Sequence, residues 1–308
     1  MVKENILFLR NRPRVFNLGD FLCTPLYYFD FFCNAYESAF LLKNKPYKVI
    51  LGGGAFNDLG VSLNLRYEEA VAWGIGSSIH GKASPPTNGD SLPYRLYGLR
   101  DPDAVKDPEK LLPCVSCLHP IAALEPGTAT TAFLNFDRNI TDLNSIIEYA
   151  DLRKHHVGIF TNYLDELQFM RIFSKTKQVI TNSYHISYWS LLSGRDVAII
   201  GYSSKFRSLA QLTGITPDVI TEYDLKNKGS LGPVIAAILA LGRFANLKNY
   251  REVRENFIQK NIRFAKKCCE MGFIREFRLR PHSAMGMFRR NITYKCFEAF
   301  AKLLRRRG

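Results

Sequence analysis

The stretch VITNSYHISYWSLLSGRDVAIIGYSSKFRSL, residues 179–209, decides the fold. It begins with a β-branched run that predicts a short strand, and Ser183 follows as a good N-cap for an apolar helix. Gly194 is suited to end this helix, and residues 196–200 form a second strand-like run. This order predicts a parallel α/β sheet. His185 then falls in the first turn of a helix at the carboxyl end of a strand, where α/β proteins bind ligands and where helix amides attract anions.

The rest of the chain repeats this alternation of strands and helices. Residues 139–150 and 162–174 predict helices, and the aromatic segment 21–41 predicts one helix or two. The further predicted strands are residues 5–9, 48–51, 70–74, 94–99, 130–136 and 156–161. The sequence therefore predicts an α/β fold with two Rossmann-like domains, residues 1–125 and 126–248, which face each other across a cleft.

The C-terminal residues 249–308 form a third part, predicted as a basic helical extension that packs on the two domains. Apolar residues recur there at spacings of three and four, beginning at Tyr250, Val253 and Phe257. The extension holds sixteen Lys or Arg and five Asp or Glu, so it carries +11 of the chain's net charge of +14. Such charge favours an anionic surface such as lipid headgroups, lipid-linked pyrophosphates or nucleic acid, and a solvated helix face is the alternative interpretation.

Composition limits the class of protein and its location. Of the 308 residues, 46% are hydrophobic, which is enough for a full core. The only apolar run near the N-terminus, residues 6–9, is too short for a secretory leader, and no window holds 18 consecutive apolar residues, as a membrane-spanning helix would need. The seven cysteines match no small-disulfide framework and predict a reduced chain. We therefore expect a cytoplasmic protein, with peripheral contact to the inner face of the membrane, and no nucleic-acid partner.

One cysteine cluster raises the question of a metal. Cys114 and Cys117 stand two residues apart with His119 close behind, a spacing found in zinc sites. A structural zinc site needs four ligands, and the adjacent pair Cys268–Cys269 is poorly spaced to complete one. The sequence thus predicts no metal and no cofactor.

Four short motifs occur in an order that resembles the polysaccharide pyruvyl transferase family. The motifs are Asn17-Leu-Gly19-Asp20, the glycine-rich turn Leu51-Gly52-Gly53-Gly54, the Arg-Asp of Gly98-Leu-Arg100-Asp101, and the set Thr181, Ser183, Tyr184, His185, Gly194 and Lys205. Together they span roughly residues 5–215. Many members of that family carry Arg two residues before the histidine, where this chain has Ser183.

The resemblance implies a function as well as a fold. It implies a transferase that moves a pyruvyl group from phosphoenolpyruvate onto a sugar of a surface polysaccharide or its lipid-linked precursor. The product is a pyruvate ketal, and the chemistry requires no metal. It also implies an arrangement of domains like that of two-domain glycosyltransferases.

His185 and Asp20 are the expected catalytic residues. An imidazole titrates near neutral pH, so His185 can give a proton to the donor or take one from a sugar hydroxyl. Asp20 can orient or deprotonate that hydroxyl, or it can be a helix cap. For His185 the alternative is a hydrogen-bonded core histidine.

The remaining candidates are expected to bind substrate. Lys205, Arg207 and Arg100 can hold the carboxylate or phosphate that the missing arginine does not, or they can be surface charges. Glycines allow the backbone to approach a ligand closely, although a simple tight turn is the alternative for the glycine-rich motif. The other expected substrate-binding residues are Asn17, Gly19, Gly53, Gly54 and Ser183.

Two other function classes remain open on the sequence. One is a two-domain glycosyltransferase that uses a nucleotide sugar, and the other is a non-catalytic membrane-surface protein of polysaccharide assembly. A donor screen separates them, because each class predicts a different ligand or none.

Overall fold

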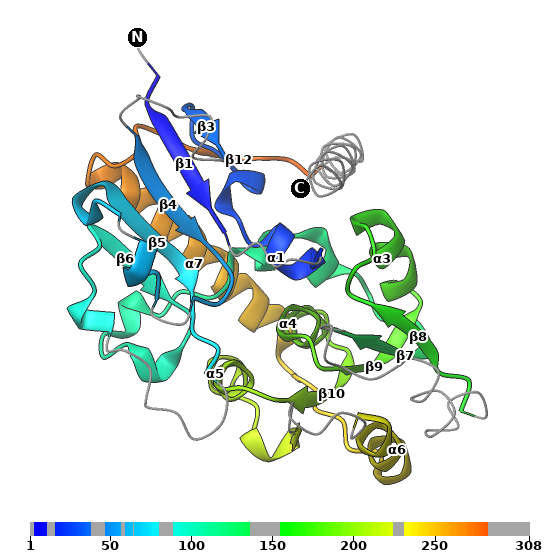
Figure 1. The fold of residues 1–308 in the computed structure, drawn as a ribbon. Coiled ribbons are helices and arrows are strands. Elements are labelled where there is room, and N and C mark those ends of the chain that lie inside the picture. The colour runs from blue at the N-terminus through cyan, green and yellow to red at the C-terminus, as the bar shows by residue number, and fades with distance from the viewer. Residues whose placement is uncertain are drawn as a thin grey trace, which may run out of the picture.

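A first parallel sheet of five strands forms the N-terminal part of the computed structural model, which describes residues 3–10, 16–37, 47–56, 59–63, 65–79, 89–135, 155–223 and 231–282. Its strands stand in the order β3-β1-β4-β5-β6, and every pair is parallel (Figure 1). Their bounds are β1 Asn5–Leu9, β3 Asn34–Tyr36, β4 Lys48–Gly52, β5 Ala70–Ile75 and β6 Leu96–Leu99.

A second parallel sheet of five strands repeats this topology. Its order is β11-β10-β9-β7-β8, and again every pair is parallel. The bounds are β7 Ala129–Leu134, β8 Gly158–Thr161, β9 Thr176–Thr181, β10 Asp196–Gly201 and β11 Ile220–Glu222. In both sheets the chain starts at an inner strand, β1 or β7, and adds the next strand on one side of it. The three later strands are then added on the other side of that first strand. This is an order typical of Rossmann-like α/β sheets, so the predicted fold class is confirmed at that level.

Helices cover the faces of the second sheet and join it to the first. Helix α6 (Leu231–Leu241) packs on one face through Ile235 and Ile238. On the other face lie α3 (Glu166–Phe173), α4 (Tyr184–Leu192) and α5 (Ser204–Thr213). The long helix α7 (Tyr250–Glu270) contributes Phe257 to that same core and Phe264 to the core of the first sheet. The predicted amphipathic helix from Tyr250 is therefore confirmed, and it spans both cores (Figure 1).

The prediction of one or two helices over residues 21–41 is wrong for the part that the structure describes. Helix α1 (Leu18–Leu22) ends just before Pro25, which begins a 3₁₀ turn. The chain then forms β2 (Phe29–Asp30), which pairs with β12 (Arg278–Leu279), and the edge strand β3. The aromatic side chains responsible for the helical pattern instead cover Trp73: the rings of Phe29 and Phe31 lie 5.4 and 5.9 Å from its ring. Tertiary packing has overridden the local pattern here.

Asp101 does not cap a helix as the sequence predicts, and some other predicted elements lie outside the described residues. Asp101 precedes only a 3₁₀ turn, Pro102–Ala104, and its side chain makes no cap hydrogen bond there. Its Oδ2 accepts instead from the backbone N and hydroxyl of Ser77, at 2.6 and 2.9 Å. The predicted helix at 139–150 and the chain after residue 282 lie outside the described residues. The domain boundaries at 125 and 248 remain predictions.

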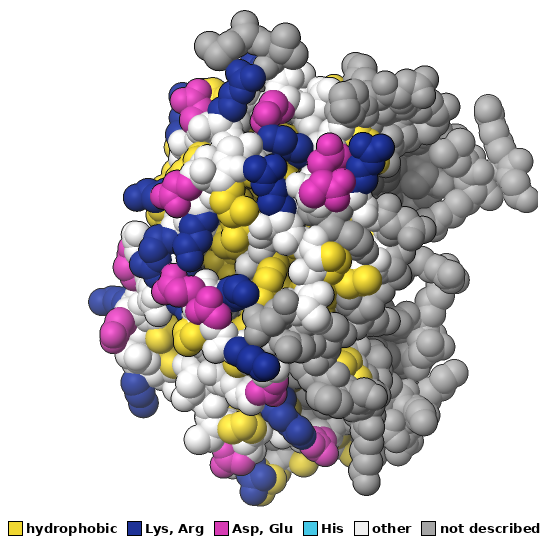
Figure 2. All heavy atoms as spheres, turned by 90° about the vertical axis from the view of Figure 1, so that its left-hand side faces the viewer, with side chains coloured by type: hydrophobic (Ala, Val, Ile, Leu, Met, Phe, Trp, Pro, Cys, Tyr) yellow, Lys and Arg dark blue, Asp and Glu magenta, His cyan; other side chains and the backbone are white. Residues whose placement is uncertain are grey.

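Charges of both signs are mixed on the face of the molecule that Figure 2 shows, where Lys and Arg side chains are interspersed with Asp and Glu. On α7, Arg251 lies 3.6 Å from Glu125 and Lys267 lies 3.2 Å from Glu109. The described part of the basic extension thus has acidic neighbours. None of the described helices is both long and apolar enough to cross a bilayer.

We predict that Asn261→Ala lowers the free energy of unfolding by about 1–3 kcal/mol, because the change leaves buried polar groups unpaired. Asn261 is fully buried on α7; its Oδ1 accepts from the indole N–H of Trp73 at 2.8 Å, and its Nδ2 donates to the Pro113 carbonyl at 3.3 Å. Urea unfolding measures the loss. The control is Gln259→Ala on the exposed side of the same helix, expected within about 0.5 kcal/mol of wild type. Equal effects of the two changes would contradict this role for Asn261.

Candidate functional site

The two expected catalytic residues, Asp20 and His185, follow strands that flank the point where the strand order reverses, which lies between β1 and β4 in the first sheet and between β7 and β9 in the second. In sheets of this type, ligands bind outside the carboxyl ends of the strands at this switch point. Strand β1 of the first sheet is followed by Asn17 and α1, and β9 of the second is followed by Ser183 and α4. Asn182 ties the ends of β9 and β7 together: its Oδ1 accepts from the Asn135 N at 2.6 Å, and its Nδ2 donates to the Asn135 carbonyl at 3.2 Å.

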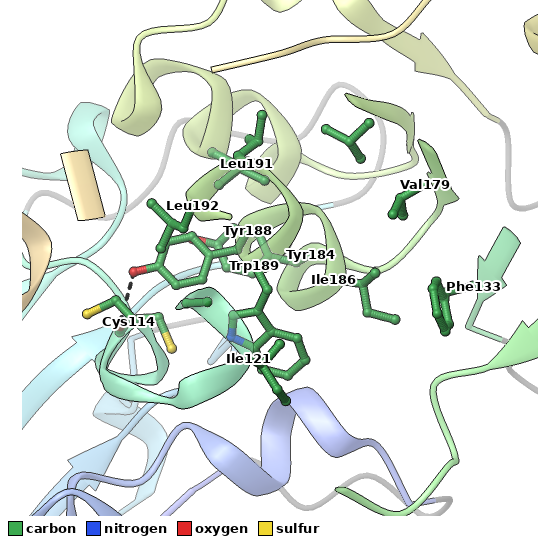
Figure 3. Close-up of a cluster of buried hydrophobic side chains, with 14 of the residues drawn as sticks. Cys114, Ile121, Phe133, Val179, Tyr184, Ile186, Tyr188, Trp189, Leu191 and Leu192 are labelled. Carbon is green, nitrogen blue, oxygen red and sulfur yellow. Dashed lines mark hydrogen bonds between the residues drawn. The ribbon is translucent and has the colours of Figure 1, made fainter. Parts of the chain in front are cut away.

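Helix α4 is buried along its whole length, which fixes the position of His185. Every residue of the helix is buried, consistent with its apolar sequence. Two side chains also anchor it to the segment that connects the sheets. The Tyr188 hydroxyl donates to the Cys114 carbonyl at 2.9 Å (Figure 3). The Trp189 indole N–H donates to the Ser116 hydroxyl at 3.1 Å. His185, only 4% exposed, is thereby held rigidly at the start of the helix.

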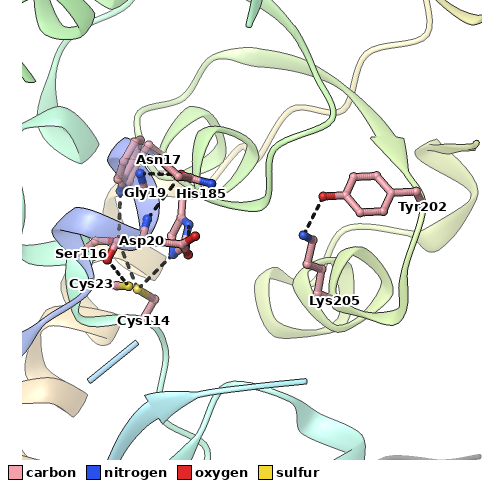
Figure 4. A network of polar contacts seen from close by, with 10 residues as sticks. Asn17, Gly19, Asp20, Cys23, Cys114, Ser116, His185, Tyr202 and Lys205 are labelled. Carbon is pink, nitrogen blue, oxygen red and sulfur yellow. Dashed lines mark hydrogen bonds and ion pairs between the residues drawn. The ribbon is translucent and has the colours of Figure 1, made fainter. Parts of the chain in front are cut away.

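Helix α1 meets α4 directly at the expected catalytic residues (Figure 4). Asn17 caps α1, with its Oδ1 accepting from the N–H groups of Gly19 at 3.0 Å and Asp20 at 3.4 Å. A Cβ on Gly19 would lie 2.3 Å from His185 Nδ1, so only glycine allows this approach. The Asp20 carboxylate is left 4.0 Å from His185 Nδ1. The structure therefore brings together Asn17, Gly19, Asp20 and His185 as the motifs predict.

Two buried thiols lie on the other side of the imidazole. Cys114 Sγ is 3.8 Å from His185 Nε2 and 3.2 Å from the Ser116 hydroxyl, and it shares a hydrogen bond with the Cys23 thiol. Burial alone would raise the pKa of Cys114, but the hydrogen bonds from Cys23 and His185 and the nearby positive charges hold it well below its ordinary value. Burial and the neighbouring Cys114 raise the pKa of Cys23. The Cys23 thiol also donates to the backbone carbonyl of Asp20 at 3.2 Å, which fixes its position at the end of α1.

Arg100 is a buried cation next to this cluster. It is 1% exposed and lies 4.0 Å over the ring of Tyr184, the neighbour of His185. Its Nε and Nη1, like the Tyr184 hydroxyl, have no hydrogen-bond partner among the described residues. The buried Arg195 makes a contrast, because its guanidinium donates to four backbone carbonyls: those of Thr176, Leu124, Glu125 and Phe173. Buried donors without protein partners indicate a place for an acceptor from outside the chain.

Lys205 lies at the start of α5, and its side chain is directed toward Tyr202 (Figure 4). Its Nζ donates to the Tyr202 hydroxyl at 2.9 Å, and its charge acts on Asp20. Burial raises the pKa of Asp20, while the positive charges of His185, Lys205 and Arg100 act in the opposite direction. The net effect is a pKa of the Asp20 carboxyl above its ordinary value.

The loop after β5 fixes the start of α5, where Lys205 lies. The Ser78 and Ser203 hydroxyls are 3.1 Å apart, and the Ser204 hydroxyl accepts from the Ile79 N at 3.0 Å. The backbone N of Ser204 in turn donates to the Ile79 carbonyl at 2.9 Å. The two sheets are therefore connected by hydrogen bonds beside the site.

Four of the predicted substrate-binding positions, Arg207, Gly53, Gly54 and Ser183, have other surroundings. The Arg207 side chain is 69% exposed and lies 3.5 Å from Glu222, away from the cluster. Gly53 has φ +69°, and a Cβ there would lie 2.1 Å from the Cys23 Cβ, so it serves a tight turn packed against Cys23. Gly54 continues this turn at φ +87°. Ser183 stands at the N-cap of α4 without a side-chain cap hydrogen bond.

The three residues of the predicted zinc spacing, Cys114, Cys117 and His119, do not point to a common centre but have separate partners. His119 turns to Glu166, with 3.0 Å between Nε2 and Oε1, and its Nδ1 accepts from the Ile121 N. Cys117 accepts from Asn261, whereas Cys114 faces His185 and Cys23. Sequence reasoning missed the two thiols at His185. The one available signal was that Cys23 follows Asp20 by three residues, which places both on one side of a short helix.

Comparison with protein-family models gave no match, and comparison with curated proteins found no similar sequence. The chemistry of the site is therefore argued from its own residues.

We predict that the two N-cap residues differ in their contribution to stability. Asn17→Ala removes the acceptor for two N–H groups of α1 and should lower the free energy of unfolding by about 0.5–2 kcal/mol. Ser183→Ala removes no cap hydrogen bond and should cost less. Urea unfolding of both variants measures the difference, and an equal or larger loss in Ser183→Ala would show that the cap bonds at Asn17 contribute little.

Proposed function

We propose that the protein transfers a pyruvyl group from phosphoenolpyruvate to a sugar of a surface polysaccharide or its lipid-linked precursor. The observation that carries the proposal is the pairing of a buried, partly unpartnered Arg100 with an imidazole–carboxylate pair at the switch points of the two sheets. A guanidinium with free donors suits a carboxylate or phosphate. The pair His185–Asp20 suits proton transfer beside it.

The reaction divides into proton transfers that these residues can perform. One sugar hydroxyl adds to C2 of the enol while C3 takes up a proton, which gives a phosphorylated hemiketal. Phosphate then leaves, and the second hydroxyl closes the ketal and loses its proton. In the proposal His185 carries the proton to C3 and Asp20 accepts a hydroxyl proton. No oxidant or reductant enters, since the sum is donor plus diol giving ketal plus phosphate.

Arg100 also accounts for Ser183 at the position where many members of the resembling family have arginine. The guanidinium of Arg100 lies over Tyr184, the residue between Ser183 and His185, so a positive charge is supplied to the same place from another strand. The Tyr184 hydroxyl adds a further unpartnered donor among the described residues. Lys205 supplies a second cation from the start of α5. The proposed donor site thus uses Arg100, Tyr184 and Lys205.

We predict that His185→Gln slows turnover by about 10²–10⁴-fold, because glutamine keeps a hydrogen bond but cannot exchange a proton near neutral pH. Phosphate release from phosphoenolpyruvate in the presence of acceptor measures the rate, and donor binding should be retained. The control is His155→Gln, at an exposed position outside the site, expected to act like wild type. A folded His185→Gln protein with near-normal turnover would make His185 a structural histidine.

We predict that Arg100→Lys weakens binding of phosphoenolpyruvate by about 10- to 100-fold, since hydrogen bonds to charged groups contribute about 1.5–3 kcal/mol. Lys205→Ala should weaken it through the loss of one charge. Titration calorimetry with the donor alone measures both effects. Arg207→Lys, at the exposed pair with Glu222, is the matched control and should leave donor affinity unchanged. Unchanged affinity in Arg100→Lys would remove Arg100 from the donor site.

A donor screen tests the proposal against its alternatives. Acceptor-dependent phosphate release from phosphoenolpyruvate supports pyruvyl transfer. Selective binding of a nucleoside diphosphate would favour a glycosyltransferase instead. Binding of neither, together with binding to anionic vesicles, would favour a non-catalytic protein at the membrane surface.

A further inference from the structure

Two thiols converge on the imidazole of His185. Cys114 Sγ is 3.8 Å from His185 Nε2. The Cys23 thiol hydrogen-bonds to Cys114 and lies within 4.8 Å of a ring nitrogen of His185 and a carboxylate oxygen of Asp20. The two thiols and the imidazole therefore lie next to one another, as Figure 4 shows.

This spacing suits a tetrahedral zinc ion. With Zn–S near 2.3 Å and Zn–N near 2.0 Å, the edges of a zinc tetrahedron are roughly 3.3–3.8 Å long. The distance of 3.8 Å between Cys114 Sγ and His185 Nε2 already equals such an edge. The Cys23 Sγ lies at most 4.8 Å from a ring nitrogen of His185, so it would have to move only about 1 Å closer to reach the same length. Thiolate and imidazole are the ligands that zinc prefers over harder ions.

The surroundings hold these ligands as a built site. Gly53 packs against the Cys23 side chain and Gly19 against the imidazole, where a Cβ would lie 2.1 and 2.3 Å from atoms of the two side chains. The Asp20 carboxylate lies 4.0 Å from Nδ1, the ring nitrogen other than the one beside Cys114. A carboxylate behind the ring is the usual device that orients a metal-binding histidine.

We infer that Cys23, Cys114 and His185 Nε2 form a zinc-binding site, with Asp20 as the carboxylate partner of the imidazole or as a fourth ligand. The site differs from the Cys114, Cys117 and His119 spacing of the sequence, because His119 is engaged by Glu166. An ion on Nε2 withdraws that nitrogen from proton transfer. Zinc should therefore inhibit the pyruvyl transfer, a consequence that rests on the proposed function, whereas the binding itself does not.

Metal binding by the full chain tests the inference without donor or acceptor. Protein freed of metal by a chelator is dialysed against Zn²⁺ and analysed for zinc content, and a second sample is loaded with Co²⁺ for absorption spectroscopy. We expect about one ion per chain and thiolate-to-cobalt charge-transfer bands. Cys23→Ser and Cys114→Ser should each weaken binding at least about 10-fold. Cys33→Ser, at a cysteine of the β2–β3 segment, is the matched control and should bind like wild type.

Each outcome decides the question. Stoichiometric zinc that is lost in both variants and kept in Cys33→Ser supports the site. Absence of stoichiometric zinc in wild type, or binding unchanged in Cys23→Ser and Cys114→Ser, overturns it. If a variant fails to fold by circular dichroism, the wild-type Co²⁺ spectrum decides, because a spectrum without thiolate bands excludes these cysteines as ligands. Failure of the transferase assay alone leaves the result on zinc unchanged, so the two proposals fail separately.

Discussion

The complete burial of helix α4 is the constraint on which the rest of the site depends. A helix that is apolar on all sides must be surrounded by protein, and here it is enclosed by the second sheet, α7 and the segment that joins the two sheets. Its two inward hydrogen bonds, from Tyr188 and Trp189, end on that joining segment. The same contacts that bury the helix therefore place Cys114 beside His185, so that core packing and site geometry cannot be changed independently.

The repeated strand order of the two sheets explains why this place is suited to a ligand. Each sheet reverses its strand order between two inner strands, and one strand of each such pair, β1 or β9, leads into a helix; these two helices, α1 and α4, contact each other. Gly19 lets the two helices approach until the backbone of α1 touches the imidazole. Helix-end amides, a histidine and a carboxylate then lie together, which is a combination that binds anions and moves protons.

The site also concentrates groups that are costly to bury. Arg100 is placed in the interior with two donors unpartnered among the described residues, whereas Arg195, equally buried, is satisfied by four carbonyls. Fully satisfied polar groups fix a fold, and unsatisfied ones cost free energy that a ligand can recover. The two thiols at His185 add a third kind of chemistry, and they make the imidazole a point for which a proton and a metal ion would compete.

The sequence alone determined the elements with strong local patterns: the strands at 5–9 and 48–51, the apolar helix that carries His185, and the long amphipathic helix from Tyr250. It also indicated Asn17, Gly19, Asp20 and His185, because turn residues next to strands mark the carboxyl edge of a sheet. It did not determine residues 21–41, where Pro25 and contacts of Phe29 and Phe31 with Trp73 replaced helix by short strands. Nor could it predict that Cys114 contacts Cys23 or that His119 contacts Glu166. It also could not predict that Arg100 is buried in the core whereas Arg207 is exposed on the surface. Spacing along the chain specifies local conformation, but the partners of a side chain are decided by which distant segments the folded core brings into contact.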